Sequence, residues 1–116
     1  MSIVAAYENS ATISTTEYSL PNNSTSLTPI TADGVYQLFL DLSALTATEE
    51  YLLKIYEKVQ SAGTQRVVDQ VTFIGTQYPA HYVYPVALVL LHGWDMTMDK
   101  IAGTDRAIAW SIRAIQ

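Results

Sequence analysis

The amino-acid sequence predicts an all-β fold: a single antiparallel β-sandwich or jelly-roll-like domain, preceded by a flexible N-terminal arm. Three observations lead to this prediction. Apolar and polar residues alternate over several short runs, which is the period of a half-buried strand. Turn-forming residues separate these runs at short intervals, as in antiparallel sandwiches and barrels. The length of 116 residues fits one domain.

The composition limits the classes of function open to this chain. Apolar residues make up 49% and charged residues only 15%, and the formal net charge is −5. The six basic residues are scattered singly, so we expect no basic patch for nucleic acid. The lack of cysteine excludes disulfides, thiolate chemistry and cysteine-type zinc sites. We find neither a signal peptide nor an apolar run long enough for a bilayer, so we expect synthesis in a cytoplasm.

Residues 1–32 are rich in Ser, Thr and Asn, and the predicted sandwich domain follows at residues 33–116. The first segment is either an arm that orders on a partner or an edge strand. Ala11 and Ile13 alternate with polar neighbours, as they would in an edge strand. Pro21–Ser24 is predicted to be a turn, because proline, asparagine and serine favour turn conformations.

The middle of the chain contains one clear strand and one ambiguous segment. The clear strand covers residues 34–42, and its inward face carries Tyr36, Leu38, Leu40 and Leu42. Residues 49–60 fit a helix that begins at a capping box between Thr46 and Glu49. They also fit a strand whose inward residues are Tyr51, Leu53, Ile55 and Val59. We favour the strand, because a turn at residues 61–64 and an alternating run at residues 67–73 would complete a hairpin.

Three more strands are predicted in the last third of the chain. Residues 82–91 are almost continuously apolar, which is typical of a central strand. Residues 94–99 and 108–113 alternate strictly, and the loop containing Gly103 between them predicts a hairpin. The inward faces of this pair carry the largest apolar side chains, which are Trp94, Met96, Met98, Ile108, Trp110 and Ile112.

No pattern in the sequence predicts catalysis, a cofactor or a bound metal. His81 and His92 lie at opposite ends of one predicted strand, too far apart to share an ion, so we expect strand-end or interface histidines. Asp95, Asp99 and Asp105 could offer oxygen ligands to calcium. Their spacing matches no known calcium loop, so we favour a solvated face. Motifs for a phosphate loop or an activated serine are absent, and we expect a protein that is not an enzyme.

Aromatic residues are the remaining candidates for a binding site. Tyr78, Tyr82 and Tyr84 with Trp94 could form a stacking platform for a sugar. Strand cores and protein interfaces use the same side chains, so this pattern alone does not specify a glycan. The candidate contacts with a partner or a glycan are Tyr78, Tyr82, Tyr84 and His92.

Five stretches within residues 33–116 resemble a known group of proteins. They are Gly34–Ser43, Leu53–Val59, Gly63–Arg66, Gly93–Thr97 and Ala102–Arg113. The group consists of small virion structural proteins of tailed bacteriophages and prophages, and the chain looks most like the capsid decoration (cement) type. In the similar sequences the run at residues 53–59 is a strand, which agrees with our choice for that segment.

The resemblance implies a protein that binds the outer surface of a phage capsid and stabilises it. Its partner would be the major capsid protein, with no role for nucleic acid or membrane, and its location would be the virion after synthesis in the host cytoplasm. A homo-oligomer is expected, and a trimer suits the local symmetry of an icosahedral shell best. The alternatives are a low-copy tail, fibre or head–tail component and, in another class, a carbohydrate-binding β-module. A small hydrolase ranks lowest.

Overall fold

The computed structural model describes residues 1–116, and every regular element in it is a β-strand. In chain order the strands are β1 (Ile3–Ile13), β2 (Tyr18–Ser19), β3 (Gly34–Asp41), β4 (Glu50–Glu57), β5 (Arg66–Ile74), β6 (His81–Val83), β7 (Leu88–Leu90), β8 (Asp95–Ala102) and β9 (Arg106–Ile115). The predicted all-β fold is confirmed. The structure contains no helix long and apolar enough to cross a membrane.

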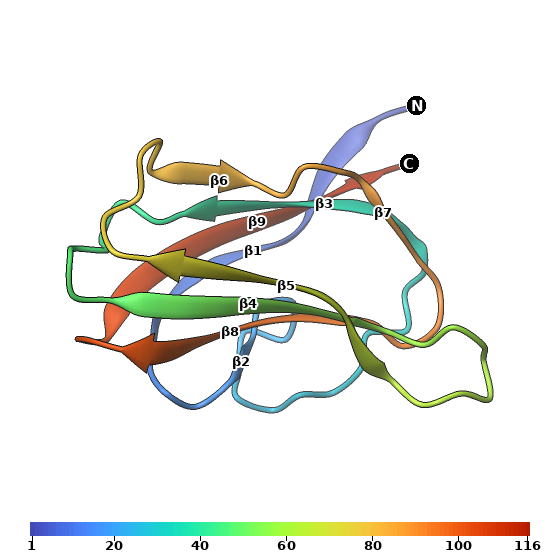
Figure 1. Ribbon diagram of the computed structural model, residues 1–116. Helices are drawn as coiled ribbons and strands as arrows, with labels where there is room; N and C mark the ends of the chain where they lie inside the picture. The colour runs from blue at the N-terminus through green and yellow to red at the C-terminus, as the bar shows by residue number, and fades with distance from the viewer.

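Two antiparallel sheets form the two layers of a sandwich, as the sequence predicted (Figure 1). One sheet has five strands in the order β1-β9-β3-β6, and β7 also pairs with β3. The other sheet has four strands in the order β2-β8-β4-β5. The two chain ends lie side by side at one end of the five-stranded sheet, where Ser2 and Gln116 exchange two backbone hydrogen bonds of 2.8 Å.

The inward faces of both sheets share one core. Alternation places every second residue of β3, β4, β8 and β9 in it, and the fully buried side chains include Leu38, Tyr51, Leu53, Ile55, Trp94, Met96, Met98, Ile108 and Ile112. The inward faces predicted for residues 34–42, 94–99 and 108–113 are therefore confirmed. Burial of these side chains is the main favourable term in the stability of such a domain.

Residues 50–57 form strand β4, so the strand alternative for the ambiguous segment is confirmed. Val59 lies beyond the end of β4 and is 91% exposed, so its predicted inward position is wrong. The contact expected of a capping box does form, since the N–H of Thr46 donates to Oε1 of Glu49 at 2.7 Å. It closes a turn before β4 instead of a helix, because the following residues alternate with period two.

The N-terminal segment is an edge strand, and the flexible arm in the predicted fold is wrong. Strand β1 pairs with β9 from Ile3 to Ile13, with a bulge between Ala5 and Tyr7. Ile13 is 0% exposed and Leu20 is 1% exposed, so the segment contributes side chains to the core. The predicted turn at Pro21–Ser24 is present, and the N–H of Asn23 donates to the carbonyl of Leu20 at 3.1 Å.

Residues 82–91 do not form the central strand that their apolar character predicted. They divide into the short strands β6 and β7, which both lie outside β3 at the edge of the sheet. Pro85 separates them, because proline offers no N–H for the ladder. Val83, Val89 and Leu91 are 43%, 80% and 54% exposed. An apolar run therefore marks a surface here and not an interior strand.

Strands β8 and β9 do not pair, so the predicted hairpin between residues 94–99 and 108–113 is wrong. Strand β8 lies between β2 and β4, whereas β9 lies between β1 and β3 in the other sheet. The loop containing Gly103 carries the chain across the sandwich (Figure 1). The two inward faces meet through the core, which satisfies the same alternation that a hairpin would.

Candidate binding surface

The outer face of the five-stranded sheet carries a row of aliphatic side chains near the chain ends. Ile3 is the register partner of Ile115, Ile115 of Val35, and Val35 of Val89. Directly opposed residues of neighbouring strands share one face of a sheet, so the four side chains form a continuous row. Ile3, Ile115 and Val89 are 68%, 43% and 80% exposed. We call these four residues the aliphatic row.

An aromatic ring and a guanidinium continue this surface away from the chain ends. Phe39 is the register partner of Val83 on one side and Ser111 on the other. The guanidinium carbon of Arg113 lies 3.7 Å from the centre of the Phe39 ring. Such stacking is favourable because the ring face carries negative potential. The pair separates the aliphatic row from a more polar region.

That polar region is an open trough of about 530 Å³. Ala109 and Ser111 of β9 line it with Ser10 of β1, and these side chains are too small to fill the space above the strands. The side chains around it include Glu8, Asp41, His81 and Arg113, which are charged or can become charged. The trough can accept small side chains or a polar ligand, and it offers no enclosed chamber.

Asp41 is the carboxylate of this trough with the most contacts. Its Oδ1 accepts a hydrogen bond of 3.0 Å from the N–H of Ser43 and lies 3.6 Å from Nε2 of His81. Hydrogen bonding from Ser43 lowers the pKa of Asp41, and His81 adds a smaller effect in the same direction. This carboxylate is therefore ionised at neutral pH and suited to accepting hydrogen bonds.

The aspartates considered for calcium do not come together. Asp105 lies 2.5 Å from Nζ of Lys100. Asp95 is 2% exposed and accepts hydrogen bonds from the Ser19 hydroxyl at 2.7 Å and the N–H of Met96 at 2.8 Å, so the solvated face predicted for it is wrong. Strand β2 covers it from the edge of the sheet. No group of three or more His, Cys, Asp or Glu residues is placed to hold a metal ion.

Burial has a large effect on the ionisation of Asp95. It raises the pKa of this carboxyl to about 6, and the hydrogen bonds from Ser19 and Met96 oppose the shift. Nearby Glu17 raises it further. The Glu17 carboxylate accepts a hydrogen bond from the Tyr56 hydroxyl at 2.5 Å. The hydrogen bond from Ser19 to Asp95 joins β2 to β8.

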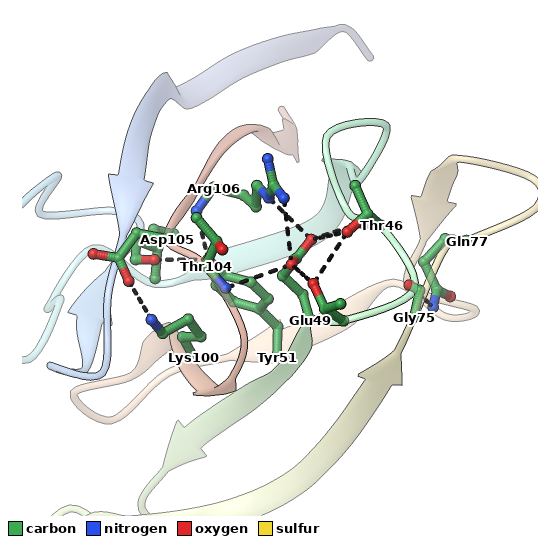
Figure 2. A network of polar contacts seen from close by, with 11 residues as sticks. Thr46, Glu49, Tyr51, Gly75, Gln77, Lys100, Thr104, Asp105 and Arg106 are labelled. Atoms are coloured by element: carbon green, nitrogen blue, oxygen red, sulfur yellow. Dashed lines mark hydrogen bonds and ion pairs between the residues drawn. The ribbon is translucent and has the colours of Figure 1, made fainter.

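A second network joins three loops at one end of the sandwich (Figure 2). At its centre the Glu49 carboxylate, whose side chain is fully buried, accepts a hydrogen bond of 2.9 Å from Nε of Arg106. It also accepts hydrogen bonds from Thr46 and Thr48. These contacts, with Thr48 contributing most, lower the pKa of Glu49. A carboxylate so fully engaged is a structural anchor and a poor general base.

Tyr51 links this network to the N-terminal strand. Its hydroxyl accepts a hydrogen bond of 2.8 Å from the N–H of Arg106 (Figure 2). The same hydroxyl donates a hydrogen bond of 2.7 Å to the carbonyl of Ile13. Sequence analysis noted Thr46 and Glu49 but missed the network, because Arg106 is far away in the chain. The only local signal was the capping-box spacing.

The candidate aromatic platform is not assembled. Trp94 is fully buried, and its Nε1–H donates to the carbonyl of Ala32 at 2.9 Å. Tyr84 is 6% exposed, and its hydroxyl donates to Asp69, so burial and this contact raise its pKa to about 12. Tyr82 packs edge-on against Phe73 with ring centres 4.9 Å apart. Tyr78 is fully exposed by itself.

The histidines also occupy separate places. His92 is partly buried, and its backbone N–H donates to Oε1 of Glu57 at 3.0 Å. His81 is exposed at the trough beside Asp41. Sequence analysis missed the trough, because its residues come from β1, β3, β6 and β9. The signal that could have indicated it is the run of small outward side chains at Ala107, Ala109 and Ser111.

Comparisons with known proteins give one similar structure. No protein-family model matches the chain, and no curated protein matches it. A solved structure described as a xylan-binding domain from CBM 22, formally x6b domain, is similar with a TM-score of 0.37 and 17% sequence identity. The similarity covers 85% of this chain and only 64% of that one. So distant a similarity carries no argument about what this chain binds.

Proposed function

We propose that this chain is a virion structural protein that binds the outer surface of a bacteriophage capsid and stabilises it as a decoration protein. The resemblance over residues 33–116 supplies the class of partner, which is the major capsid protein. The proposed location is the capsid surface after synthesis in the host cytoplasm. The proposed action is binding alone, without a chemical step.

The observation that carries this proposal is the aliphatic row on an otherwise uncovered sheet face. Ile3, Ile115 and Val89 expose large apolar surfaces side by side, together with partly buried Val35. Contiguous apolar surface of this kind typically marks a site of protein association. Phe39 and Arg113 adjoin it, and aromatic and arginine side chains are enriched at protein interfaces.

Binding of this kind stabilises a shell by mass action. A protein that binds the assembled capsid and not its separate subunits lowers the free energy of the assembled state. The rigid sandwich suits this role, because little conformational entropy is lost when a preordered surface docks. The low charge of the chain, with only 15% charged residues, leaves few charges to desolvate.

Copy number in the virion is the first test. We expect quantitative mass spectrometry of purified virions to give a ratio to the major capsid protein near one or a simple fraction such as one third. A few copies per virion would instead assign the chain to the tail, a fibre or the head–tail junction. Absence from the virion would refute the proposal.

A matched pair of variants tests the surface. Val89→Asp places a charge in the aliphatic row, where Val89 is 80% exposed. Ile74→Asp places a charge at a similarly exposed position, 70%, on the other sheet. We expect Val89→Asp to weaken binding to capsids that lack the protein by at least about tenfold. Ile74→Asp should bind as the unmodified protein does. Equal binding by both variants would exclude this face as the capsid contact.

A further inference from the structure

The outer edge of β1 is a long strand edge without the usual protection against pairing. β1 is the terminal strand of the five-stranded sheet and spans eleven residues, most of which are exposed. It contains one charged residue, Glu8, and neither lysine nor proline. Exposed edges normally carry lysine, proline or a covering segment, because their free N–H and C=O groups can hydrogen-bond to a strand of another molecule.

The other edges of the sandwich have such protection. β2 has two residues, and β6 and β7 have three each, with Pro79 and Pro85 beside them. β5 is long but carries Arg66 and Asp69, and a bulge interrupts its pairing with β4. Its Asp69 is also engaged by Tyr84. Edge pairing is therefore favoured at β1.

We propose that a second copy of this chain pairs antiparallel with β1 across a two-fold axis at Ser10, joining two five-stranded sheets into one. The N–H of Ser10 donates to the side-chain Oδ1 of Asn9 at 2.9 Å, an acceptor outside the β1–β9 ladder. The backbone groups of Ser10 thus point to the free edge, together with those of Glu8 and Thr12, since alternate residues point the same way.

Charge favours a second copy in this register. With Ser10 opposite its symmetry mate, Glu8 of each copy lies opposite Thr12 of the other. The two Glu8 carboxylates are kept apart, and each can accept a hydrogen bond from the facing Thr12 hydroxyl. Each opposed pair of Ser10, Glu8 and Thr12 exchanges two backbone hydrogen bonds. The bulge between Ala5 and Tyr7 limits the pairing to residues 7–13.

The pairing has a consequence for the trough. Glu8 and Ser10 line it from β1, so the troughs of two copies lie on either side of the shared strands. The outer face becomes one broad surface with two-fold symmetry. A dimer of this geometry differs from the trimer that the resemblance implies, and it does not depend on the proposed capsid binding.

Sedimentation velocity of the purified chain over a range of concentrations tests the inference. We expect a species of twice the 12.8 kDa chain mass at high concentration. Thr12→Glu places two carboxylates opposite each other at both ends of the pairing, and we expect about five- to thirtyfold weaker dimerisation. Thr12→Lys at the same exposed position faces Glu8 and should dimerise at least as well as the unmodified chain.

A third variant addresses the backbone. Ser10→Pro removes the N–H at the two-fold axis and leaves the β1–β9 ladder intact, because that N–H does not face β9. We expect a folded monomer, with circular dichroism matching that of the unmodified chain. A monomer at all concentrations, a trimer, or equal dimerisation of the Thr12→Glu and Thr12→Lys variants would overturn the inference. If Ser10→Pro folds and still dimerises normally, the inference is also overturned.

Discussion

Replacing Asp95 with asparagine should change how stability depends on pH. The carboxyl is 2% exposed, accepts hydrogen bonds from Ser19 and Met96, and has a pKa raised by burial to about 6. The folded protein therefore binds this proton more tightly than the unfolded chain. The resulting stabilisation is fully present below pH 3.8, the ordinary pKa, and is lost as pH rises through about 6.

The size of the effect follows from the pKa difference. A shift from 3.8 to about 6 corresponds to at most about 3 kcal/mol of unfolding free energy. Between pH 5 and 8 the loss amounts to about 1.4 kcal/mol, because at pH 5 the unfolded chain has already released this proton while the folded protein still holds most of it. Asparagine keeps an acceptor for Ser19 and Met96 but never carries the buried charge. We expect Asp95→Asn to stabilise the protein at pH 8 by up to about 3 kcal/mol.

Urea unfolding of both proteins at pH 5 and at pH 8 measures this effect. The difference between variant and unmodified protein isolates Asp95, because the other titrating groups contribute equally to both. Glu49, whose pKa is lowered, contributes stability that is lost only as pH falls below its ordinary value of 4.5, outside this range. Asp33→Asn, the same substitution at an exposed position, is the control for the chemical change itself. A pH dependence of Asp95→Asn identical to that of the unmodified protein would refute the reasoning.

Three further predictions concern the packing of the sandwich. At Gly103, where φ is +88°, an added Cβ would lie 2.5 Å from the carbonyl oxygen of Thr48, so Gly103→Ala should cost about 3 kcal/mol or more. Gly75→Ala, with φ at +74° but no atom closer than 3.9 Å, should lower the free energy of unfolding in urea by only about 1–2 kcal/mol. Equal losses of stability for the two glycine variants would contradict the close approach of Gly103 to Thr48. Trp110 is 3% exposed, so Trp110→Ala should cost about 3–5 kcal/mol, whereas a loss under about 1 kcal/mol would mean that the ring does not support the core. Deletion of residues 2–13 should abolish the cooperative unfolding transition in urea, because β9 loses this pairing partner along its whole length. A truncated chain that still folds would show that β1 is dispensable.

The candidate surface could be predicted only in part from the sequence. The alternation in residues 106–115 indicates which side chains of β9 face outward, and the sequence shows that Ala107, Ala109 and Ser111 among them are small. Nothing local indicates that Ile3, Val35 and Val89 lie in one row with Ile115, because this row joins strands from both ends of the chain. The surface depends on strand order, and strand order is a property of the assembled sheets.

The candidate tyrosines also show that a binding surface could not be predicted from the sequence alone. Tyr78, Tyr82 and Tyr84 are close in the sequence and looked like one group. The structure separates them, since Tyr84 turns its hydroxyl to Asp69 and Tyr82 packs on Phe73 while Tyr78 is fully exposed. An aromatic side chain is equally suited to a core or to a surface, so its type alone cannot decide between them.

The sequence by itself determined the fold class, the strands β3, β8 and β9, and the faces of these strands that are buried. For residues 49–60 it only favoured the strand over a helix, and the structure decided for strand β4. Period two is a local property, and a one-residue slip would expose every buried side chain. Only the tertiary structure decided that β8 and β9 lie in opposite sheets, that residues 82–91 form two edge strands, and that Asp95 is buried under β2. Alternation fixes which face of a strand meets the core, whereas its neighbours are chosen by contacts between distant segments, and many strand orders satisfy the same alternation.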